Sequence, residues 1–278
     1  MALCPDWGHC INPISFNGIK NLITCLWFCV SLGHMLAFMT TKIRLFVDHP
    51  LGAAQSVELT REQAHYLFAV MRQPVGASVS LFNSRDGQWQ AEIVEAGKRK
   101  GLLLCKKQTK ALQMPPDLWF MFAPIKKSRT DFIVEKAAEM GAARILPIQT
   151  EFTNSERVRR DRLQTHAIEA AEQCGGTFVP QVDEMRSLES LLCEWPSDRH
   201  LMFCDEEKVG QASSLAGFPK GPWAILIGPE GGFSKNERQK LNGLSFAHSI
   251  ALGPRILRAD TAAVAALSLW QTHLGDWS

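Results

Sequence analysis

The chain has 278 residues, of which 46% are hydrophobic and 21% charged, and its formal net charge is only +2. These values are typical of a globular protein and exclude collagen-like and low-complexity disordered chains; the length suits two domains or one large one. The charge is uneven, because residues 39–110 carry five more basic than acidic residues and residues 111–278 carry three more acidic than basic ones. A basic segment favours a phosphate-backbone partner, although a chance scatter of surface charge gives a similar imbalance.

The first 38 residues differ in composition from the rest of the chain. They contain two charged residues, four of the eight cysteines, and an apolar run from Leu22 to Leu32. That run is too short to span a bilayer comfortably, and no clear cleavage site of small residues follows it. No Cys/His spacing fits a zinc site, so we expect no metal. We expect residues 1–38 to form no domain and Met39 to be the true start, with a membrane anchor as the alternative.

Short strands and tight turns follow in residues 39–110. Apolar runs at residues 43–47, 77–82, 88–95 and 102–106 predict strands, and Asp86-Gly87 marks a hairpin turn. Thr60 and Gln63 form a capping box, which predicts that a helix begins after Thr60. Several short strands joined by tight turns within about seventy residues are typical of a small β-barrel.

Basic side chains of this segment are candidates for contacting a nucleic-acid backbone. Long cationic side chains neutralise phosphates without reading the base sequence. The candidates are Lys42, Arg44, Arg72, Arg85, Lys98, Arg99 and Lys100, of which Arg44 and Arg72 are preferred. For residues 98–100, a solvated hairpin tip is an equally good interpretation.

The second predicted domain, residues 111–278, follows a linker at residues 108–117 that contains two prolines. Apolar strands at residues 118–123, 144–149 and 200–204 alternate with helices. The apolar faces of the first two helices are formed by Ile133, Ala137 and Met140, and by Leu163, Ala167, Ala170 and Cys174. This alternation predicts an α/β fold with a mostly parallel sheet and helices on both faces.

Two strand–loop–helix units close the chain. Residues 223–227 form a buried strand, the loop Gly228–Gly232 follows, and Ser234 with Glu237 forms a capping box for a helix. In the second unit a strand at residues 249–252 and a loop at residues 253–254 precede a long amphipathic helix. Two glycine loops at the carboxyl ends of strands are typical of a ligand crevice. Ordinary strand-to-helix turns are the alternative, and both P-loop and dinucleotide-binding spacings are absent.

The two loops also carry a family resemblance. Leu226-Ile-Gly-Pro-Glu-Gly-Gly232, together with Leu252-Gly-Pro-Arg-Ile-Leu-Arg258, resembles the C-terminal signature of the ribosomal RNA small subunit methyltransferase E family, which belongs to the SPOUT methyltransferases. The likeness includes Ala170-Ala-Glu-Gln-Cys-Gly175 and spans residues 42–276. The family usually has Thr-Glu-Thr after the second arginine, whereas this chain has Ala259-Asp260-Thr261 and lacks the first hydroxyl.

The resemblance implies a SPOUT-type knotted sheet, through which the last helix passes, preceded by a PUA-like RNA-binding β-barrel. It also implies methyl transfer from S-adenosyl-L-methionine to N3 of a uridine in small-subunit (16S) ribosomal RNA. A cytoplasmic homodimer without membrane contact is expected on the same basis. The alternatives are a SPOUT ribose 2′-O-methyltransferase acting on transfer or ribosomal RNA, and a non-catalytic RNA-binding ribosome-assembly factor.

The resemblance further implies roles for individual residues. The expected cofactor-binding residues are Leu226, Ile227, Gly228, Pro229, Gly231, Gly232, Leu252, Gly253, Ile256, Leu257 and Thr261. Because uridine N3 carries a proton near neutral pH, methyl transfer needs a general base or cations that stabilise negative charge on the flanking carbonyl oxygens. Arg258 and Arg255 suit the cationic role. Glu230 and Asp260 suit the base, although a helix N-cap is an alternative for Asp260.

Basic residues of the second domain form two groups. Lys126, Lys127 and Arg129 follow the first strand, where a loop faces the crevice, and Arg157, Arg159, Arg160 and Arg162 form the other group. We expect Lys126, Lys127, Arg129 and Arg157 to contact the RNA backbone. The remaining arginines are equally compatible with a solvated helix face.

Overall fold

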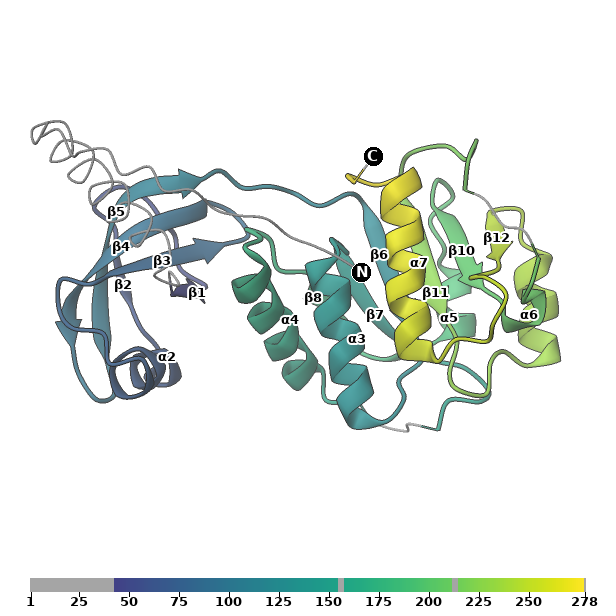
Figure 1. Ribbon diagram of the computed structural model, residues 1–278, viewed down its shortest axis with the longest axis horizontal. Coiled ribbons are helices and arrows are strands. Elements are labelled where there is room, and N and C mark those ends of the chain that lie inside the picture. The colour runs from purple at the N-terminus through teal and green to yellow at the C-terminus, as the bar shows by residue number, and fades with distance from the viewer. Residues whose placement is uncertain (1–42, 155–157, 212–214, 278) are drawn as a thin grey trace, which may run out of the picture. The chain divides into compact units, whose positions relative to one another are not determined.

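The structure is a computed structural model that describes residues 43–154, 158–211 and 215–277 (Figure 1). The expectations for residues 1–38, Lys42 and Arg157 lie outside these described residues. The described chain contains a five-stranded sheet followed by a seven-stranded sheet.

The N-terminal sheet has the strand order β1-β3-β4-β5-β2. Its strands are β1 (Arg44–Phe46), β2 (Ser56–Glu58), β3 (Ser78–Asn83), β4 (Gly87–Ala96) and β5 (Gly101–Lys110). All pairs are antiparallel except β1–β3, and register shifts between β4 and β5 bend the sheet around its core. The predicted capping box at Thr60 is present and starts α2 (Arg61–His65), which continues into η1 (Tyr66–Val70). This is a small barrel-like domain of the kind predicted.

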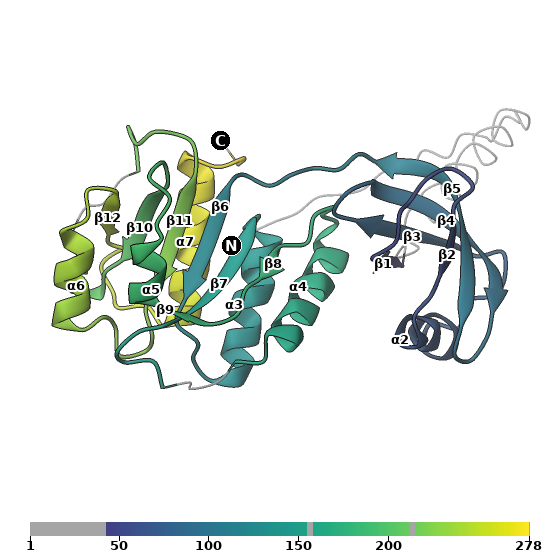
Figure 2. The same ribbon diagram turned by 180° about the vertical axis from the view of Figure 1, so that it is seen from behind.

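The second sheet is parallel in every pair and has the order β12-β10-β11-β6-β7-β8, with β9 also paired to β7. Its strands are β6 (Leu118–Phe122), β7 (Arg144–Gln149), β8 (Gln181–Val182), β9 (Arg186–Ser187), β10 (His200–Cys204), β11 (Trp223–Ile227) and β12 (Ala247–Ile250). Helices α3 (Lys127–Glu139), α4 (Arg160–Cys174) and α7 (Ala259–His273) cover one face, and α5 (Leu188–Cys193) and α6 (Lys235–Asn242) cover the other (Figures 1 and 2). The predicted α/β fold is confirmed.

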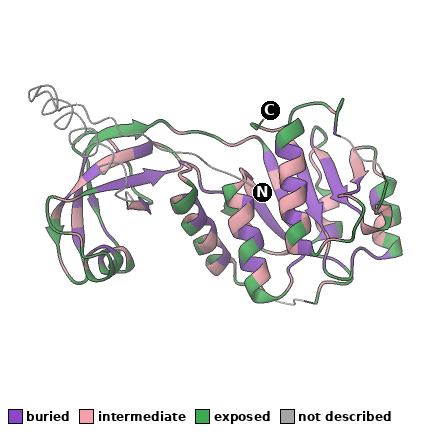
Figure 3. Ribbon diagram, in the orientation of Figure 1, coloured by how far each residue is buried: buried purple, intermediate pink, exposed green. Residues whose placement is uncertain are grey.

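The central strands are buried on both faces (Figure 3). On β6, Phe120 and Phe122 enter the core beneath α3 and α7, whereas Met121 enters the core beneath α5 and α6. On β11, Ile225 and Leu226 divide in the same way. Burying a side chain of this size contributes about 1.5–3 kcal/mol. The near-continuous apolar sequence of these strands is therefore required by helices on both sides of the sheet.

Three local predictions need correction. Strand β12 ends at Ile250, because its pairing with β10 ends where Ile250 lies opposite Cys204, so Leu252 belongs to the loop. Strand β5 continues to Lys110, which confines the linker to residues 111–117. Cys174, predicted on the buried face of α4, is exposed because the helix ends there, before Gly175 in the left-handed conformation.

The path of the chain brings the two loops of the signature together. Strand β12 lies at the sheet edge beyond β10, yet α7 packs against α3 and β11. The segment after β12 therefore returns past the end of β10, where Gly210 N donates to Gly253 O at 3.1 Å. This return places the loop after β12 beside the loop after β11. The threading of α7 through a knot stays an expectation from the resemblance.

Arg44 joins the N-terminal sheet to the end of α4. Its guanidinium donates to the carbonyl oxygens of Ala171, Glu172 and Gly176 at 2.6–2.8 Å and to Gln88 Oε1 at 2.9 Å. Carbonyl oxygens at a helix C-terminus have no hydrogen-bond donor within the helix, and the Arg44 guanidinium provides such donors at the end of α4. Four of the five N–H donors of Arg44 are thus engaged by the protein itself, and the RNA contact predicted for Arg44 stays a prediction.

Candidate active site

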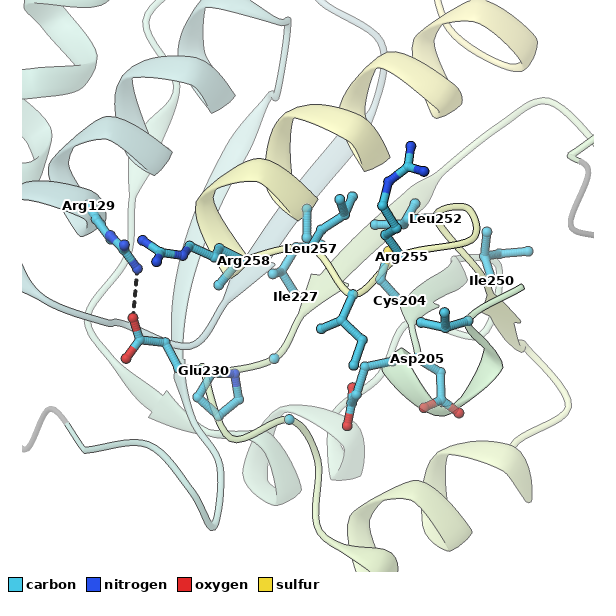
Figure 4. A pocket seen from close by; sticks show the side chains of 18 of the residues that line it. Arg129, Cys204, Asp205, Ile227, Glu230, Ile250, Leu252, Arg255, Leu257 and Arg258 are labelled. Atoms are coloured by element: carbon cyan, nitrogen blue, oxygen red, sulfur yellow. Dashed lines mark hydrogen bonds and ion pairs between the residues drawn. The ribbon is translucent and has the colours of Figure 1, made fainter. Parts of the chain in front are cut away.

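A cavity of about 520 Å³ lies between the two glycine-containing loops (Figure 4). Its walls come from the end of β10, the loop after β11, the loop after β12 and the first turn of α3. The predicted site residues that line it are Lys126, Arg129, Ile227, Gly228, Pro229, Glu230, Gly232, Leu252, Arg255, Ile256, Leu257 and Arg258. A cavity of this size at the carboxyl ends of parallel strands suits a small-molecule ligand.

Four of the predicted cofactor-binding residues, all within the described chain, do not line the cavity. Leu226 is fully buried in the core under α5 and α6, because alternate residues of β11 face opposite sides of the sheet. A Cβ at Gly231 would lie 3.4 Å from Phe152, away from the cavity lining. Gly253 and Thr261 lie in the second loop and in the first turn of α7.

The sequence prediction missed a complete wall of the cavity. The missed lining residues are Cys204, Asp205, Glu206, Val209, Ile250, Ala259 and Ala262. The first four are the last residue of β10, Cys204, and three residues of the turn around η2 (Glu206–Lys208) that follows it. Strand β10 itself was predicted correctly, but its position between β11 and β12 is not visible in the sequence. Ala259 stands where the family usually has threonine, and it lines the cavity. The site therefore lacks the hydroxyl group that a threonine would place there.

The loop after β11 is fixed by packing. Gly232 has a φ of +70° and donates its N–H to Pro229 O at 2.9 Å, which forms a tight turn. A Cβ at Gly232 would overlap Glu206 Oε1, and a Cβ at Gly228 would lie 3.2 Å from the ring of Phe233. Gly232 is therefore required both for its backbone conformation and for the approach of Glu206.

Arg129 connects the two predicted carboxylates. Its Nη1 lies 2.7 Å from Glu230 Oε1, as Figure 4 shows, and its Nε lies 3.4 Å from Asp260 Oδ2. These ion pairs join α3, the first loop and the start of α7. Asp260 is not the N-cap of α7, because Arg258 occupies that position and Asp260 Oδ1 accepts from Thr261 N at 2.9 Å within the first turn.

Asp205 and Arg238 support the wall that follows β10. The Asp205 side chain is only 2% exposed and its Oδ1 accepts from Arg238 Nε at 3.0 Å, while Arg238 also reaches Glu206 at 2.6 Å and Glu207 at 2.8 Å. Although burial opposes it, the hydrogen bond to Asp205 and the three carboxylates raise the pKa of Arg238. Burial, reinforced by the charge of Asp205, raises the pKa of the Cys204 thiol. Cys204 is therefore a protonated, weakly polar part of the wall.

Arg255 and Arg258 contribute exposed cations from the second loop. Figure 4 shows Arg258 extending toward Arg129, whereas Arg255 extends toward the top of the view, away from Glu230 and Arg129. Within the described chain neither guanidinium makes an ion pair. One end of the cavity therefore brings together Arg258, Arg129 and Glu230.

The other predicted RNA contacts are dispersed. Lys126 lines the main cavity, Lys127 lines a separate one, and Arg72 is an exposed residue of the N-terminal domain with a φ of +52°. Within the described ranges, no group of three or more His, Cys, Asp or Glu side chains is arranged to hold a metal ion. No helix among the described residues is long and apolar enough to cross a bilayer.

Comparison with protein families identifies the type of enzyme. A model described as an RNA methyltransferase domain matches residues 113–271, and a model described as an RNA methyltransferase PUA domain matches residues 59–104. The chain belongs to the RNA methyltransferase domain family. The protein is thus an RNA methyltransferase with an N-terminal PUA domain.

Individual relatives agree with this assignment. The ribosomal RNA small subunit methyltransferase E of Bacillus subtilis is 29% identical over 251 residues, covering 83% of this chain and 97% of that protein. The crystal structure of the enzyme of that name from Neisseria gonorrhoeae, bound to S-adenosyl methionine, has a TM-score of 0.77 at 25% identity and covers 85% of this chain and 100% of that chain. A Legionella pneumophila methyltransferase structure with S-adenosyl methionine has a TM-score of 0.76 at 27% identity, covering 85% and 100%. The resemblance to this family is confirmed.

Proposed function

We propose that the protein transfers a methyl group from S-adenosyl-L-methionine to N3 of a uridine in small-subunit ribosomal RNA. The observation that supports this most directly is the convergence of both signature loops on one cavity of about 520 Å³. The relatives named ribosomal RNA small subunit methyltransferase E support the substrate, and the S-adenosyl methionine in the two neighbouring structures supports the cofactor.

The lining of the cavity fits this cofactor. Ile227, Leu252 and Leu257 provide apolar walls suited to an adenine ring, and Asp205 and Glu206 provide negative charge near a ligand that carries a sulfonium and an ammonium group. When bound, S-adenosylmethionine supplies an electrophilic methyl group. The role of the protein is then to orient the uridine toward it, since positioning can account for several kcal/mol of barrier lowering.

The cluster at one end of the cavity suggests how the uridine is activated. Arg258 has no ion-pair partner in the described chain and is placed to stabilise negative charge that develops on the uridine carbonyl oxygens. Glu230 is the proposed base, and Arg129 is its positioning residue because it holds one oxygen of Glu230 and also contacts Asp260. Asp260 is accordingly proposed as a second partner of Arg129, and Arg255 as a further cation from the same loop as Arg258.

Two measurements test the proposed function. The full chain is titrated calorimetrically with S-adenosylmethionine, and it is then incubated with small ribosomal subunits and labelled cofactor before nucleoside mass spectrometry. We expect cofactor binding and 3-methyluridine as the product. A ribose-methylated nucleoside would establish the 2′-O-methyltransferase alternative. RNA binding without any binding of S-adenosylmethionine would establish the assembly-factor alternative.

A homodimer and a cytoplasmic location belong to the same proposal. Both are supported by the family resemblance alone. Light scattering of the purified chain tests the first, with a mass of twice 31.0 kDa expected. A monomer that is fully active would exclude the dimer as the functional form.

A further inference from the structure

A further cavity, of about 310 Å³, lies beside the first turn of α3. It is lined by Pro124, Ile125, Lys127, Thr130, Val158, Arg159, Arg162 and Leu163. Lys127 and Thr130 are three positions apart on α3 and therefore face the same way, and Lys126 and Arg129, with the same spacing, line the main cavity. The first turn of α3 thus has the main cavity at one face and this other cavity, which we call the α3–α4 cavity, at the adjoining face.

The α3–α4 cavity has an apolar floor and a cationic rim. Pro124 and Leu163 are buried and Ile125 and Val158 are half-buried, whereas Lys127 and Arg159 are exposed. The polar atom of the floor, Thr130 Oγ1, is already used by the backbone of Ile125. The floor therefore presents mainly hydrocarbon to any ligand.

The three cations of the rim are not equivalent. Arg162 is held by Asp131, so its position is fixed and its charge is largely compensated. Lys127 and Arg159 make no ion pair with any described residue. The neighbouring Arg160 is directed elsewhere, since its Nε donates to Val182 O at 2.9 Å. Among the described residues, therefore, no acidic side chain pairs with Lys127 or Arg159, and none lines this cavity.

Two helix N-termini add to the positive potential. Lys127 is the first residue of α3, and Arg159 is the N-cap of α4. The free N–H groups at a helix N-terminus and the helix dipole favour an anion, and phosphate in particular. Neither helix has a side-chain cap hydrogen bond at this end, so no side chain of the N-cap residue occupies the first backbone N–H groups of either helix.

We propose that the α3–α4 cavity binds the nucleotide next to the target uridine in the RNA strand. The base lies on the apolar floor, and the adjoining phosphate lies between Lys127 and Arg159. A volume near 310 Å³ is at the lower end of ligand-site volumes and suits one nucleotide. This inference rests on the proposed function, because the strand crosses the first turn of α3 only when its target base occupies the main cavity.

The test compares two double variants of the full chain. Lys127→Ala/Arg159→Ala removes the two uncompensated cations of the cavity. Lys240→Ala/Arg186→Ala is the matched control, because it removes the same two residue types from exposed ion pairs with Glu189 and Glu194, outside both cavities. Binding of each variant to small-subunit ribosomal RNA is measured by filter binding at several salt concentrations. Methyl transfer is measured by label incorporation, and the affinity for S-adenosylmethionine is measured by calorimetry.

We expect the Lys127/Arg159 variant to bind RNA about tenfold or more weakly, with unchanged cofactor affinity and a kcat close to that of the wild type at saturating RNA. Each lost phosphate contact should also make the dependence of log affinity on log salt shallower by about 0.7. The control should match the wild type. A Lys127/Arg159 variant with the RNA affinity and salt dependence of the wild type would overturn the proposal.

Two further outcomes distinguish this proposal from the proposed function and from binding of a free nucleotide. A wild type that binds RNA but transfers no methyl group refutes the proposed function, while the binding comparison still decides the α3–α4 cavity. Uridine monophosphate serves as the free-nucleotide probe. If the Lys127/Arg159 variant loses affinity for this mononucleotide but retains RNA affinity, the cavity serves a free nucleotide and the RNA proposal is wrong.

Discussion

The two loops that enclose the main cavity are similar in sequence but differ in how they are held. In the loop after β11, Gly232 is packed against Glu206, Gly228 against Phe233, and Glu230 is paired with Arg129. In the loop after β12, Ile256 is 76% exposed and a Cβ at Gly253 would meet nothing within 4 Å. Apart from the bond that Gly253 O accepts from Gly210 N, the second loop is thus held by fewer contacts than the first, and we call the two loops the free wall and the fixed wall.

This difference suggests a division of labour. A fixed wall presents its amides and carboxylates in one geometry before any ligand arrives, which reduces the entropy lost on binding. A free wall can adjust to the cofactor or to a second macromolecule and bury its exposed apolar side chain at that moment. The signature motif thus combines a preformed half-site with an adaptable one.

The largest effect is expected from Gly232→Ala in the fixed wall. The substitution forces a non-glycine residue into a φ of +70° and into overlap with Glu206, which should cost about 2–4 kcal/mol of stability. We expect S-adenosylmethionine binding to fall at least a hundredfold in calorimetry and the melting temperature to fall by about 5–10 °C. A variant with the affinity and melting temperature of the wild type would show that this wall is not rigid.

Arg129→Ala should have the next largest effect, because it releases the fixed wall from α3. We expect kcat to fall about ten- to a hundredfold while cofactor affinity changes only a few-fold, with partial recovery in Arg129→Lys. Stability should fall by no more than about 1 kcal/mol, since the pair is partly exposed. Lys136→Ala, which breaks an ion pair with Glu139 on the same helix, is the control. A rise in the KM for RNA without a change in kcat would instead support the RNA contact first predicted for Arg129.

Gly253→Ala tests the free wall with the substitution used for the fixed one. Its φ of +112° makes any side chain strained, but no neighbouring atom opposes it. We expect a loss of about 1 kcal/mol, seen as a fall in melting temperature of about 2–4 °C, with cofactor affinity lowered less than tenfold. Equal losses for Gly253→Ala and Gly232→Ala would remove the distinction between the two walls.

The sequence predicted the local secondary structure better than it predicted which elements lie next to one another in space. Residues 223–227 and 200–204 were predicted as strands with their observed bounds, because short apolar runs next to glycine and proline are strong signals. The two-residue strands β8 and β9 and the short helix α5 were not predicted, since elements of this length have no measurable periodicity.

The candidate site was predictable only where it is local. The two glycine loops are contiguous motifs, and most of their residues line the cavity as expected. The wall after β10 depends on strand order, which brings Asp205 between two loops that follow later in the chain. The ion pair between Arg129 and Glu230 joins residues that are 101 positions apart in the chain. No local sequence pattern shows whether Arg129 binds Glu230 or contacts RNA.

The smallest change in stability is expected from Ile256→Ala at the tip of the free wall. Because the side chain is 76% exposed, unfolding free energy should change by less than about 0.5 kcal/mol. If the cofactor buries this side chain, removing it should weaken S-adenosylmethionine binding about three- to tenfold, as calorimetry would measure. An unchanged affinity would show that Ile256 stays exposed when the cofactor binds, and its exposed surface would then have to be covered by another macromolecule or remain in water.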